Sequence, residues 1–309
     1  MTTAPPPSEF DRQLPIREEI FLDHVGHFVP DPAAASEALK RFGFSPTPAS
    51  IQVNPDTGGG ERPAGTGNIT AMFQHGYVEA LFKTADTPLG RELASAIARY
   101  PGVHLAAFSV SDAAAAHRRL EASGFHVRPL VEMQRPVTTA LGPDIAAFTV
   151  ARVEPGEMAE GRVQILTHRT EGSVWQPRWL EHPNGAIGLI DLVIAAADVE
   201  ETADRFSLFL NRHATENQFG PVVKLDRGRV QIIAPAKFTE LTLGLAVPSL
   251  PFIGLYAVAV KSVPALEARL ARDGIAFARS GESLLVRFPD ELGVGAWMFV
   301  EQAADLPWR

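Results

Sequence analysis

An internal repeat constrains the fold of this chain more than any other feature of its sequence. Three times an apolar stretch ends in a residue that can cap a helix, and a glycine followed by an apolar residue comes twelve positions later. The three pairs are Asp31 and Gly43, Asp112 and Gly124, and Ser262 and Gly274. Asp and Ser side chains accept hydrogen bonds from the first amides of a helix, and glycine often ends one. Each copy therefore predicts a strand, a helix and a return to a strand.

The segments between these signals have helical periodicity. They read PAAASEALKRF, AAAAHRRLEAS and VPALEARLARD, with apolar residues spaced three or four apart. A fourth, weaker copy has Asp198 as its cap and Asn211 where the glycine would stand; asparagine also tolerates the left-handed conformation. Short β-rich segments follow each helix, so the predicted unit is β-α-β-β-β, used four times.

The units are expected to pair, because one unit cannot bury both its helix and its sheet face. Pairing neighbours gives an α+β fold with two tandem domains, residues 19–170 and 187–309. Residues 171–186, with two prolines and an Asn-Gly pair, predict the linker, and residues 1–18 an N-terminal arm.

Some segments fit the repeat less well. PLGRELASAIARY, residues 88–100, predicts a helix that joins the first two units. MQRPVTTALGPD, residues 133–144, is interpreted as a loop. FTELTLG, residues 238–244, is interpreted as a weak strand of the third unit.

Composition excludes several classes of function. The net charge is −8 and no useful Lys/Arg cluster occurs, which argues against nucleic-acid binding. The chain has no cysteine, so disulfides, thiolate metal sites and a cysteine nucleophile are excluded. No signal peptide or apolar run of membrane-spanning length is evident, which predicts a cytoplasmic protein without membrane contact.

The repeat, opened by LDHVGHFVPD at residues 22–31, resembles the vicinal oxygen chelate superfamily, which includes glyoxalase I and the extradiol dioxygenases. The segments GNITAMFQHGYVEAL, PLGRELASAIARYPGVHLAAF and WQPRWLEHPNGA are similar to those of bacterial glyoxalase-like domain proteins. The resemblance implies that each pair of units forms a cupped sheet. It also implies that the first and last strands of paired units supply ligands to one metal ion.

Carried over to this sequence, the resemblance implies four metal ligands: His24, Glu79, His104 and Gln164. His24 and His27 point to opposite faces of a strand, so only one of them can reach the cup, and His27 is expected to pack with the core. His104 lies eight residues before Asp112, whereas His24 lies seven before Asp31, so His104 needs a bulge to face the cup.

Imidazole, carboxylate and amide ligands without a thiolate suit one divalent ion of Zn, Ni, Fe, Co or Mn. The resemblance then implies a lyase or isomerase of the glyoxalase type. Such an enzyme acts on a small oxygenated substrate through a metal-stabilised enediolate, and Glu79 is the candidate base. Two alternatives stay open: an Fe(II) ring-cleaving dioxygenase, which Gln164 disfavours, and a non-catalytic protein that sequesters a small molecule.

Four more residues are predicted to contact the substrate from around the cup: His75, Arg135, His168 and Trp175. The second domain is predicted to be metal-free, because Asp191 and Leu255 stand at the positions of the first-strand ligands. Its role is then structural, or that of a lid or a homodimer surface.

Overall fold

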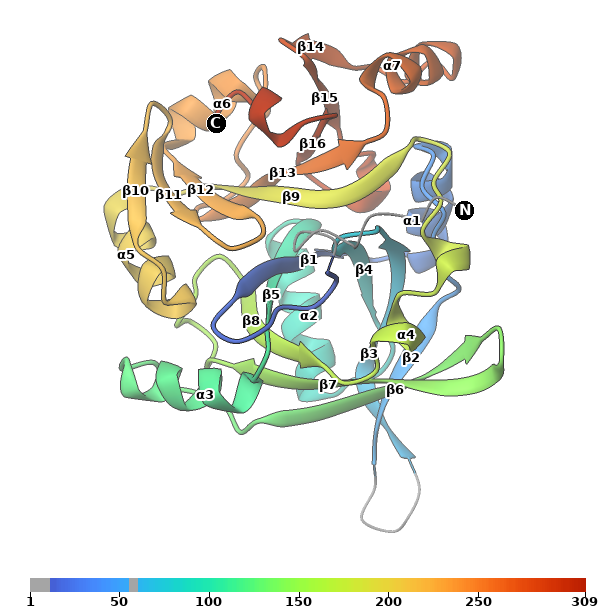
Figure 1. Ribbon diagram of the computed structural model, residues 1–309, viewed down its shortest axis with the longest axis vertical. Coiled ribbons are helices and arrows are strands. Elements are labelled where there is room, and N and C mark those ends of the chain that lie inside the picture. The colour runs from blue at the N-terminus through green and yellow to red at the C-terminus, as the bar shows by residue number, and fades with distance from the viewer. Residues whose placement is uncertain (1–11, 56–60) are drawn as a thin grey trace, which may run out of the picture.

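The computed structural model describes residues 12–55 and 61–309, and within them the chain forms two eight-stranded sheets (Figure 1). The first sheet and its helices comprise β1 (Ile20–Phe28), α1 (Pro32–Arg41), β2 (Ser50–Pro55), β3 (Glu61–Met72), β4 (Tyr77–Lys83), α2 (Pro88–Arg99), β5 (Gly102–Val110), α3 (Ala113–Ala122), β6 (Val131–Thr139), β7 (Gly142–Arg152) and β8 (Arg162–His168). Most of the predicted N-terminal arm, residues 1–11, lies outside the described residues.

Two short helices, α4 (Glu171–Val174) and η2 (Pro177–Trp179), lie between the sheets in the sequence. The second sheet and its helices comprise β9 (Ala186–Ala195), α5 (Val199–Leu210), β10 (Ala214–Asn217), β11 (Gly220–Lys224), β12 (Arg229–Ile233), α6 (Pro235–Leu241), β13 (Phe252–Val260), α7 (Val263–Arg272), β14 (Ala278–Ser280), β15 (Ser283–Arg287), η3 (Asp290–Leu292), β16 (Ala296–Val300) and η4 (Ala303–Asp305). Among these described helices, none is long and apolar enough to cross a membrane.

The strand order confirms the α+β fold with paired βαβββ units. The first sheet runs β2-β3-β4-β1-β5-β8-β7-β6, and the second repeats the pattern as β10-β11-β12-β9-β13-β16-β15-β14. In each sheet the first strands of two units pair antiparallel at the centre, β1 with β5 and β9 with β13. The domain boundaries proposed from the sequence stay predictions.

The helix caps confirm the signals that defined the repeat. Asp31, Asp112, Asp198 and Ser262 each accept hydrogen bonds from backbone amides in the first turn of the helix that follows. Asn211 ends α5 in the left-handed conformation, with φ 51° and ψ 47°. The fourth copy is therefore a complete unit despite its missing glycine.

Two local predictions were wrong. Residues 133–144 are not a loop, because β6 and β7 pair over their whole length as a hairpin. Alternate residues of β6 are half-buried and exposed, a period-2 pattern that the Pro and Thr residues obscure in the sequence. The second error concerns residues 238–244, which mostly belong to α6 rather than a strand; Pro235 stands in its first turn and Phe238 is its buried anchor.

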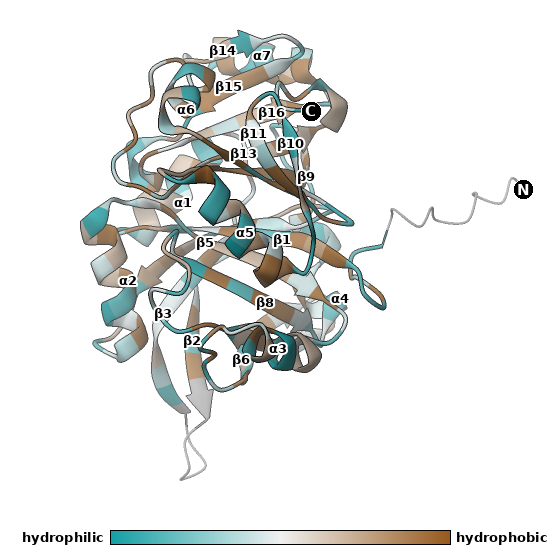
Figure 2. Cartoon of the chain, turned by 90° about the vertical axis from the view of Figure 1, so that its left-hand side faces the viewer, coloured by the Kyte–Doolittle hydropathy of each residue, from teal (hydrophilic) through white to brown (hydrophobic). Residues whose placement is uncertain are grey.

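The two sheets meet in one hydrophobic core, which Figure 2 shows as brown strands through the middle of the molecule. All nine residues of β1 are buried. One face of β1, with Val25 and His27, packs towards the second sheet, where Tyr256 and Trp297 are part of the same buried region.

His27 is bonded to the second half through both ring nitrogens. Its Nδ1 donates to the carbonyl of Leu292 at 2.8 Å, and its Nε2 lies 2.8 Å from the hydroxyl of Tyr256. That hydroxyl also accepts from Trp297 Nε1 at 2.6 Å, so its own proton goes to His27 Nε2. The chain of bonds therefore requires a neutral imidazole, and burial lowers the pKa of His27 to about 4.

The inner face of the second sheet is filled by its own side chains. Leu255, Met298, Phe238 and Trp308 belong to one buried cluster there. Asp191, at the position that corresponds to His24, accepts from Trp308 Nε1 at 3.0 Å and pairs with Arg309 at 2.5 Å. Its carboxylate is therefore already bonded within the chain; that this half is metal-free stays a prediction.

Candidate metal and substrate site

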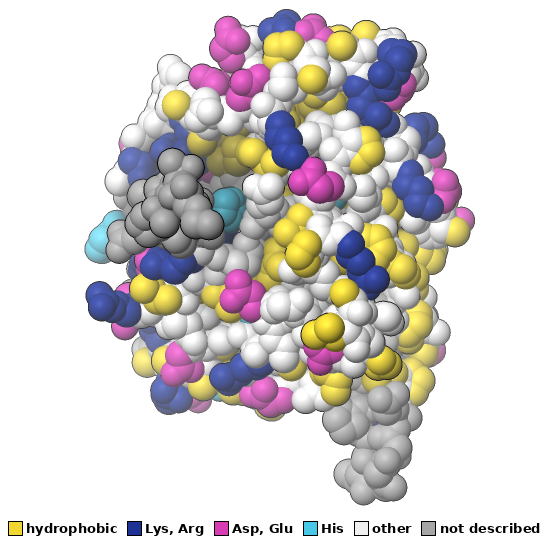
Figure 3. Space-filling view, turned by 45° about the vertical axis from the view of Figure 1, so that its right-hand side comes forward, with side chains coloured by type: hydrophobic (Ala, Val, Ile, Leu, Met, Phe, Trp, Pro, Cys, Tyr) yellow, Lys and Arg dark blue, Asp and Glu magenta, His cyan; other side chains and the backbone are white. Residues whose placement is uncertain are grey.

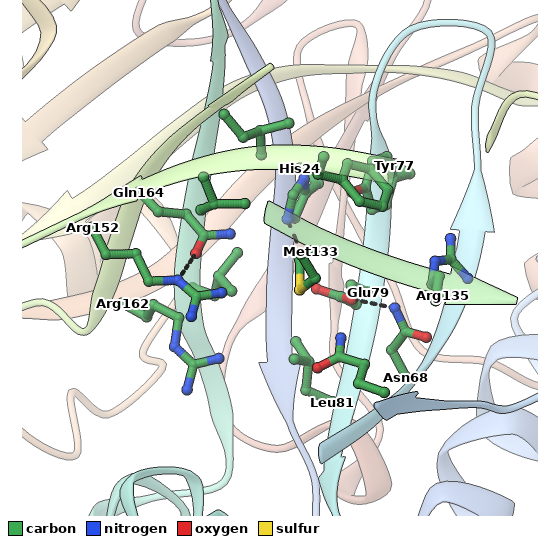
Figure 4. Close-up of a pocket in the computed structure, with 15 residues that line it drawn as sticks. His24, Asn68, Tyr77, Glu79, Leu81, Met133, Arg135, Arg152, Arg162 and Gln164 are labelled. Atoms are coloured by element: carbon green, nitrogen blue, oxygen red, sulfur yellow. Dashed lines mark hydrogen bonds and ion pairs between the residues drawn. The ribbon is translucent and has the colours of Figure 1, made fainter. Parts of the chain in front are cut away.

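A small cavity lies on the concave face of the first sheet, enclosed by strands of both of its units. The side chains of His24, Tyr77, Glu79, Arg152, Arg162 and Gln164 line it, together with apolar residues such as Leu105 and Phe148 (Figure 4). Its volume of about 30 Å³ is enough for an ion with a water molecule, because one water needs roughly 10–15 Å³. A substrate would have to enter from a larger neighbouring space.

A bulge in β1 turns His24 into this cavity. The pairing of β1 with β5 shifts register between Leu22 and His24, with Asp23 as the extra residue. Leu22 therefore faces the core between the sheets, whereas His24 faces the cavity. On the neighbouring strand β4, alternation places Tyr77, Glu79 and Leu81 on the same face.

Asp23 fixes the orientation of the His24 ring. Its Oδ1 lies 2.7 Å from His24 Nδ1, and its Oδ2 lies 2.9 Å from His168 Nε2. Burial alone would raise the pKa of Asp23, but the charge and hydrogen bonds of His168 and His24 hold it well below the usual range. An ionised carboxylate only accepts, so His24 carries a proton on Nδ1, and in the neutral imidazole the lone pair is then on Nε2.

The lone pair of His24 Nε2 faces Glu79 without a hydrogen bond between them. His24 Nε2 and Glu79 Oε2 are 3.8 Å apart, and their side chains are only 5% and 7% exposed. Two donors at this separation can both lie about 2.1 Å from one ion, the usual distance for imidazole and carboxylate ligands. The other oxygen of Glu79 accepts from Asn68 Nδ2, which orients the carboxylate. The pair therefore fits a divalent ion.

Gln164 also reaches the cavity, from β8. Its Oε1 accepts from Arg152 Nε at 3.0 Å, so one of its lone pairs is used. Within residues 12–55 and 61–309, no group of three His, Cys, Asp or Glu side chains could hold a metal. An ion at His24 and Glu79 would therefore take an amide oxygen or solvent as its next ligand.

His104 does not join the other three predicted ligands. A bulge does occur at this point, since Gly26 pairs with Leu105 and His27 with Val103. The His104 ring nevertheless turns back to Tyr100, with Nε2 2.7 Å from its carbonyl oxygen and the ring centroids 4.1 Å apart. Burial lowers the pKa of His104 to about 4. Leu105 takes its place in the cavity lining, and the predicted four-ligand set needs this correction.

Of the four predicted substrate contacts, one lines the cavity and three lie elsewhere. Arg135 lines the cavity, although from strand β6 rather than from a loop. His168 and Trp175 lie behind His24 instead: His168 bonds to Asp23, and the Trp175 ring is 4.6 Å from the His168 ring. His75 is not among the lining residues, and its backbone pairs with Ile187 and Leu189 where the two sheets meet.

The sequence interpretation missed three prominent lining residues. Tyr77 stacks on the His24 ring at 4.3 Å, and burial raises its pKa, so the phenol stays neutral. Arg152 and Arg162 line the opposite side of the cavity in Figure 4. Burial, followed by the charge of Arg162, lowers the pKa of Arg152 to about 9. Strict alternation from Glu79 and from Gln164 would have found Tyr77 and Arg162.

Comparison with known proteins decides the family. A family model described as a glyoxalase-like domain matches residues 22–209. The chain belongs to this glyoxalase-like family. No curated protein matches the sequence.

Solved structures confirm the fold of this glyoxalase-like protein, two cupped sheets built from paired βαβββ units. A hypothetical protein from Staphylococcus aureus aligns with a TM-score of 0.60 at 11% identity, over 91% of this chain and 98% of that one. A mutant 4-hydroxymandelate synthase from Streptomyces coelicolor gives 0.58 at 14% identity, over 91% and 92%. The Mn(II)-bound glyoxalase from Novosphingobium aromaticivorans gives 0.52 at 15% identity, over 92% and 83%.

Proposed function

We propose that this protein is a divalent-metal enzyme of the glyoxalase type, a lyase or isomerase of a small oxygenated substrate. His24 and Glu79 would hold the ion, with Gln164 as the amide ligand. The observation that carries the proposal is the 3.8 Å separation of two buried electron-pair donors, one of them fixed in place by Asp23. The fold shared with a Mn(II)-bound glyoxalase supports it.

The chemistry that the ion supplies, when bound, is polarisation of two adjacent substrate oxygens, which stabilises the enediolate left after proton removal. Within the chain, Glu79 is the candidate base. Its Oε2 would have to leave the ion to take that proton, while Asn68 keeps hold of its Oε1. Leu81, Leu105 and Phe148 add apolar surface to the lining of the same cavity, which limits water at the point of transfer.

The ring-cleaving alternative loses support from the position of His104. A ring-cleaving dioxygenase needs two imidazoles and one carboxylate around Fe(II). Because Gln164 is neither, His104 would have to join His24 and Glu79. His104 bonds to Tyr100 and does not line the cavity, so His24 is the one histidine in the described part of the chain that does. The sequestering protein stays open as the second alternative, and metal content distinguishes it from an enzyme.

Metal analysis tests the proposal directly. Protein purified without added ions and then dialysed against Mn, Zn, Co, Ni or Fe(II) is expected to retain one ion per chain, measured by mass spectrometry of the metals. The Glu79→Gln variant is expected to lose most of this metal, because the carboxylate is the one charged ligand. Wild-type protein that takes up none of these ions would contradict the proposal and favour the sequestering protein.

An Asp23→Asn variant tests the role of Asp23 in positioning His24. Asparagine cannot accept from both His24 and His168 as the carboxylate does, so the Nε2 lone pair is no longer fixed towards the cavity. Metal affinity is expected to fall about 10–100-fold, the usual effect of an outer partner of a ligand. Asp198→Asn, at an exposed helix cap where asparagine serves equally well, is the matched control. Equal affinity of wild type and Asp23→Asn would rule out this role.

The site is expected to take a small molecule and no nucleic acid. On the face shown in Figure 3, basic and acidic side chains are interspersed and no continuous basic strip stands out. Duplex binding needs clustered Lys and Arg, and the absence of nucleic-acid binding stays a prediction from the net charge.

A further inference from the structure

Arg152 and Arg162 lie between the closed cavity and an open groove. The groove has a volume of about 760 Å³ and is also lined by Phe28, Arg99, His104 and Arg128. Both arginines line the cavity and the groove alike. A ligand that enters from the groove therefore meets their guanidinium groups before it reaches His24 and Glu79.

These guanidinium groups are short of negative partners. Among the residues that the structure describes, Arg152 has no carboxylate within ion-pair distance, and its guanidinium bonds to the neutral amide of Gln164. Arg162 has Glu92 at 4.0 Å, but Glu92 already pairs with Arg128 at 2.7 Å. A guanidinium that is largely removed from water and lacks a counter-charge is unfavourable unless an anion joins it.

The net charge of the cavity lining also favours an anionic ligand. Three of its residues carry guanidinium groups, namely Arg135, Arg152 and Arg162, and one, Glu79, carries a carboxylate. A divalent ion at His24 and Glu79 would add further positive charge. The complete site is therefore balanced only when an anionic ligand is present.

We infer that the substrate is an anion whose carboxylate or phosphate group is held by Arg152 and Arg162, while its neighbouring oxygens reach His24 and Glu79. The planar fork of a guanidinium matches the oxygens of both anionic groups. The inference deepens the proposed function and rests on it for the reaction, but anion recognition itself needs no metal.

Calorimetric titration of the metal-free full-length protein in a non-phosphate buffer tests this inference. Glycolate is expected to bind at least tenfold more tightly than glycolamide, its neutral isostere, because charge-assisted bonds are worth about tenfold to a hundredfold each. A parallel titration with inorganic phosphate shows whether the site prefers a planar or a tetrahedral anion. Equal affinity for glycolate and glycolamide, together with no phosphate binding, would overturn the inference.

Variants locate the binding. Arg152→Gln and Arg162→Gln are each expected to weaken the binding of the preferred anion about tenfold or more. Arg118→Gln, which removes the same charge from an exposed position on α3, is the matched control and is expected to bind as wild type does. Folded Arg152→Gln and Arg162→Gln proteins that both bind the anion like wild type would refute the assignment to these residues.

A measurement on the wild type alone covers the case in which these variants fail to fold. Arginines modified by phenylglyoxal can be counted by peptide mass spectrometry, with and without the preferred anion. Glycolate or phosphate is expected to protect Arg152 and Arg162 but not Arg118, and glycolamide is expected to protect none of the three. Absence of protection at both Arg152 and Arg162 overturns the inference.

The two proposals fail separately. Protein that takes up no metal but discriminates glycolate from glycolamide contradicts the metal enzyme and keeps the anion site. If the protein holds one ion at His24 and Glu79 but binds charged and neutral ligands equally, the metal site is supported and the anion site is contradicted.

Discussion

Replacing His24 with alanine is expected to remove the tightly bound metal, with affinity reduced more than about a hundredfold. A partner that merely orients a ligand accounts for about 10–100-fold, and His24 is the ligand itself. No other described histidine lines the cavity, so no imidazole can substitute for it. Metal content after dialysis measures the loss, and the rise in melting temperature that metal gives the wild type should vanish with it.

His126→Ala is the matched control, because His126 is an exposed histidine that pairs with Glu157 and does not line the cavity. Its metal content should equal that of the wild type. One retained ion per chain in His24→Ala, at wild-type affinity, would show that the ion binds elsewhere and would end the proposal for this site.

The second large effect concerns acid stability and arises at His27. Its folded pKa is about 4, against 6.5 for an exposed histidine, so between these values the unfolded chain binds the proton more readily. The free energy of unfolding is therefore highest above pH 6.5 and falls by about 3 kcal/mol as the pH drops to 4. His104 has the same shift in the same direction, which adds to the loss.

Urea unfolding at pH 7 and pH 4.5 measures this loss. His27→Gln is expected to be less stable than the wild type at pH 7, because a buried bond to Leu292 or Tyr256 is weakened. Its stability should nevertheless change less between the two pH values, since the buried titrating group is gone. His126→Gln should keep at least the wild-type slope, because Glu157 raises the pKa of the exposed His126 and this pair opposes the acid loss in the wild type. An unchanged slope in His27→Gln would show that His27 does not cause the acid sensitivity.

The repeat made the fold predictable because its signals are local. Caps such as Asp31 and Asp112 act within three residues of themselves, and the pairing of units follows from the need to bury each sheet face. Segments without a local signal were misread: residues 133–144 look like a loop until a neighbouring strand pairs with them.

The lining of the candidate cavity was predictable where the family pattern applies, and not where a local irregularity turns a single side chain away. His24, Glu79 and Gln164 share the cavity as the family pattern implied. The direction of the His104 side chain could not be predicted. It depends on a bulge between β1 and β5, and the amino-acid sequence carries no signal for that bulge. Arg152 and Arg162 were overlooked because a basic residue on a strand is usually read as solvent-exposed.

The bonding of His27 has a consequence for how the molecule is built during synthesis. Its partners Tyr256 and Leu292 follow it by 229 and 265 residues. Most of the chain must therefore leave the ribosome before the His27 ring can form both hydrogen bonds. The face of β1 that packs towards the second sheet is therefore covered late. Until then its apolar side chains stay exposed on the nascent chain. Molecular chaperones are expected to bind the nascent protein mainly through this early segment.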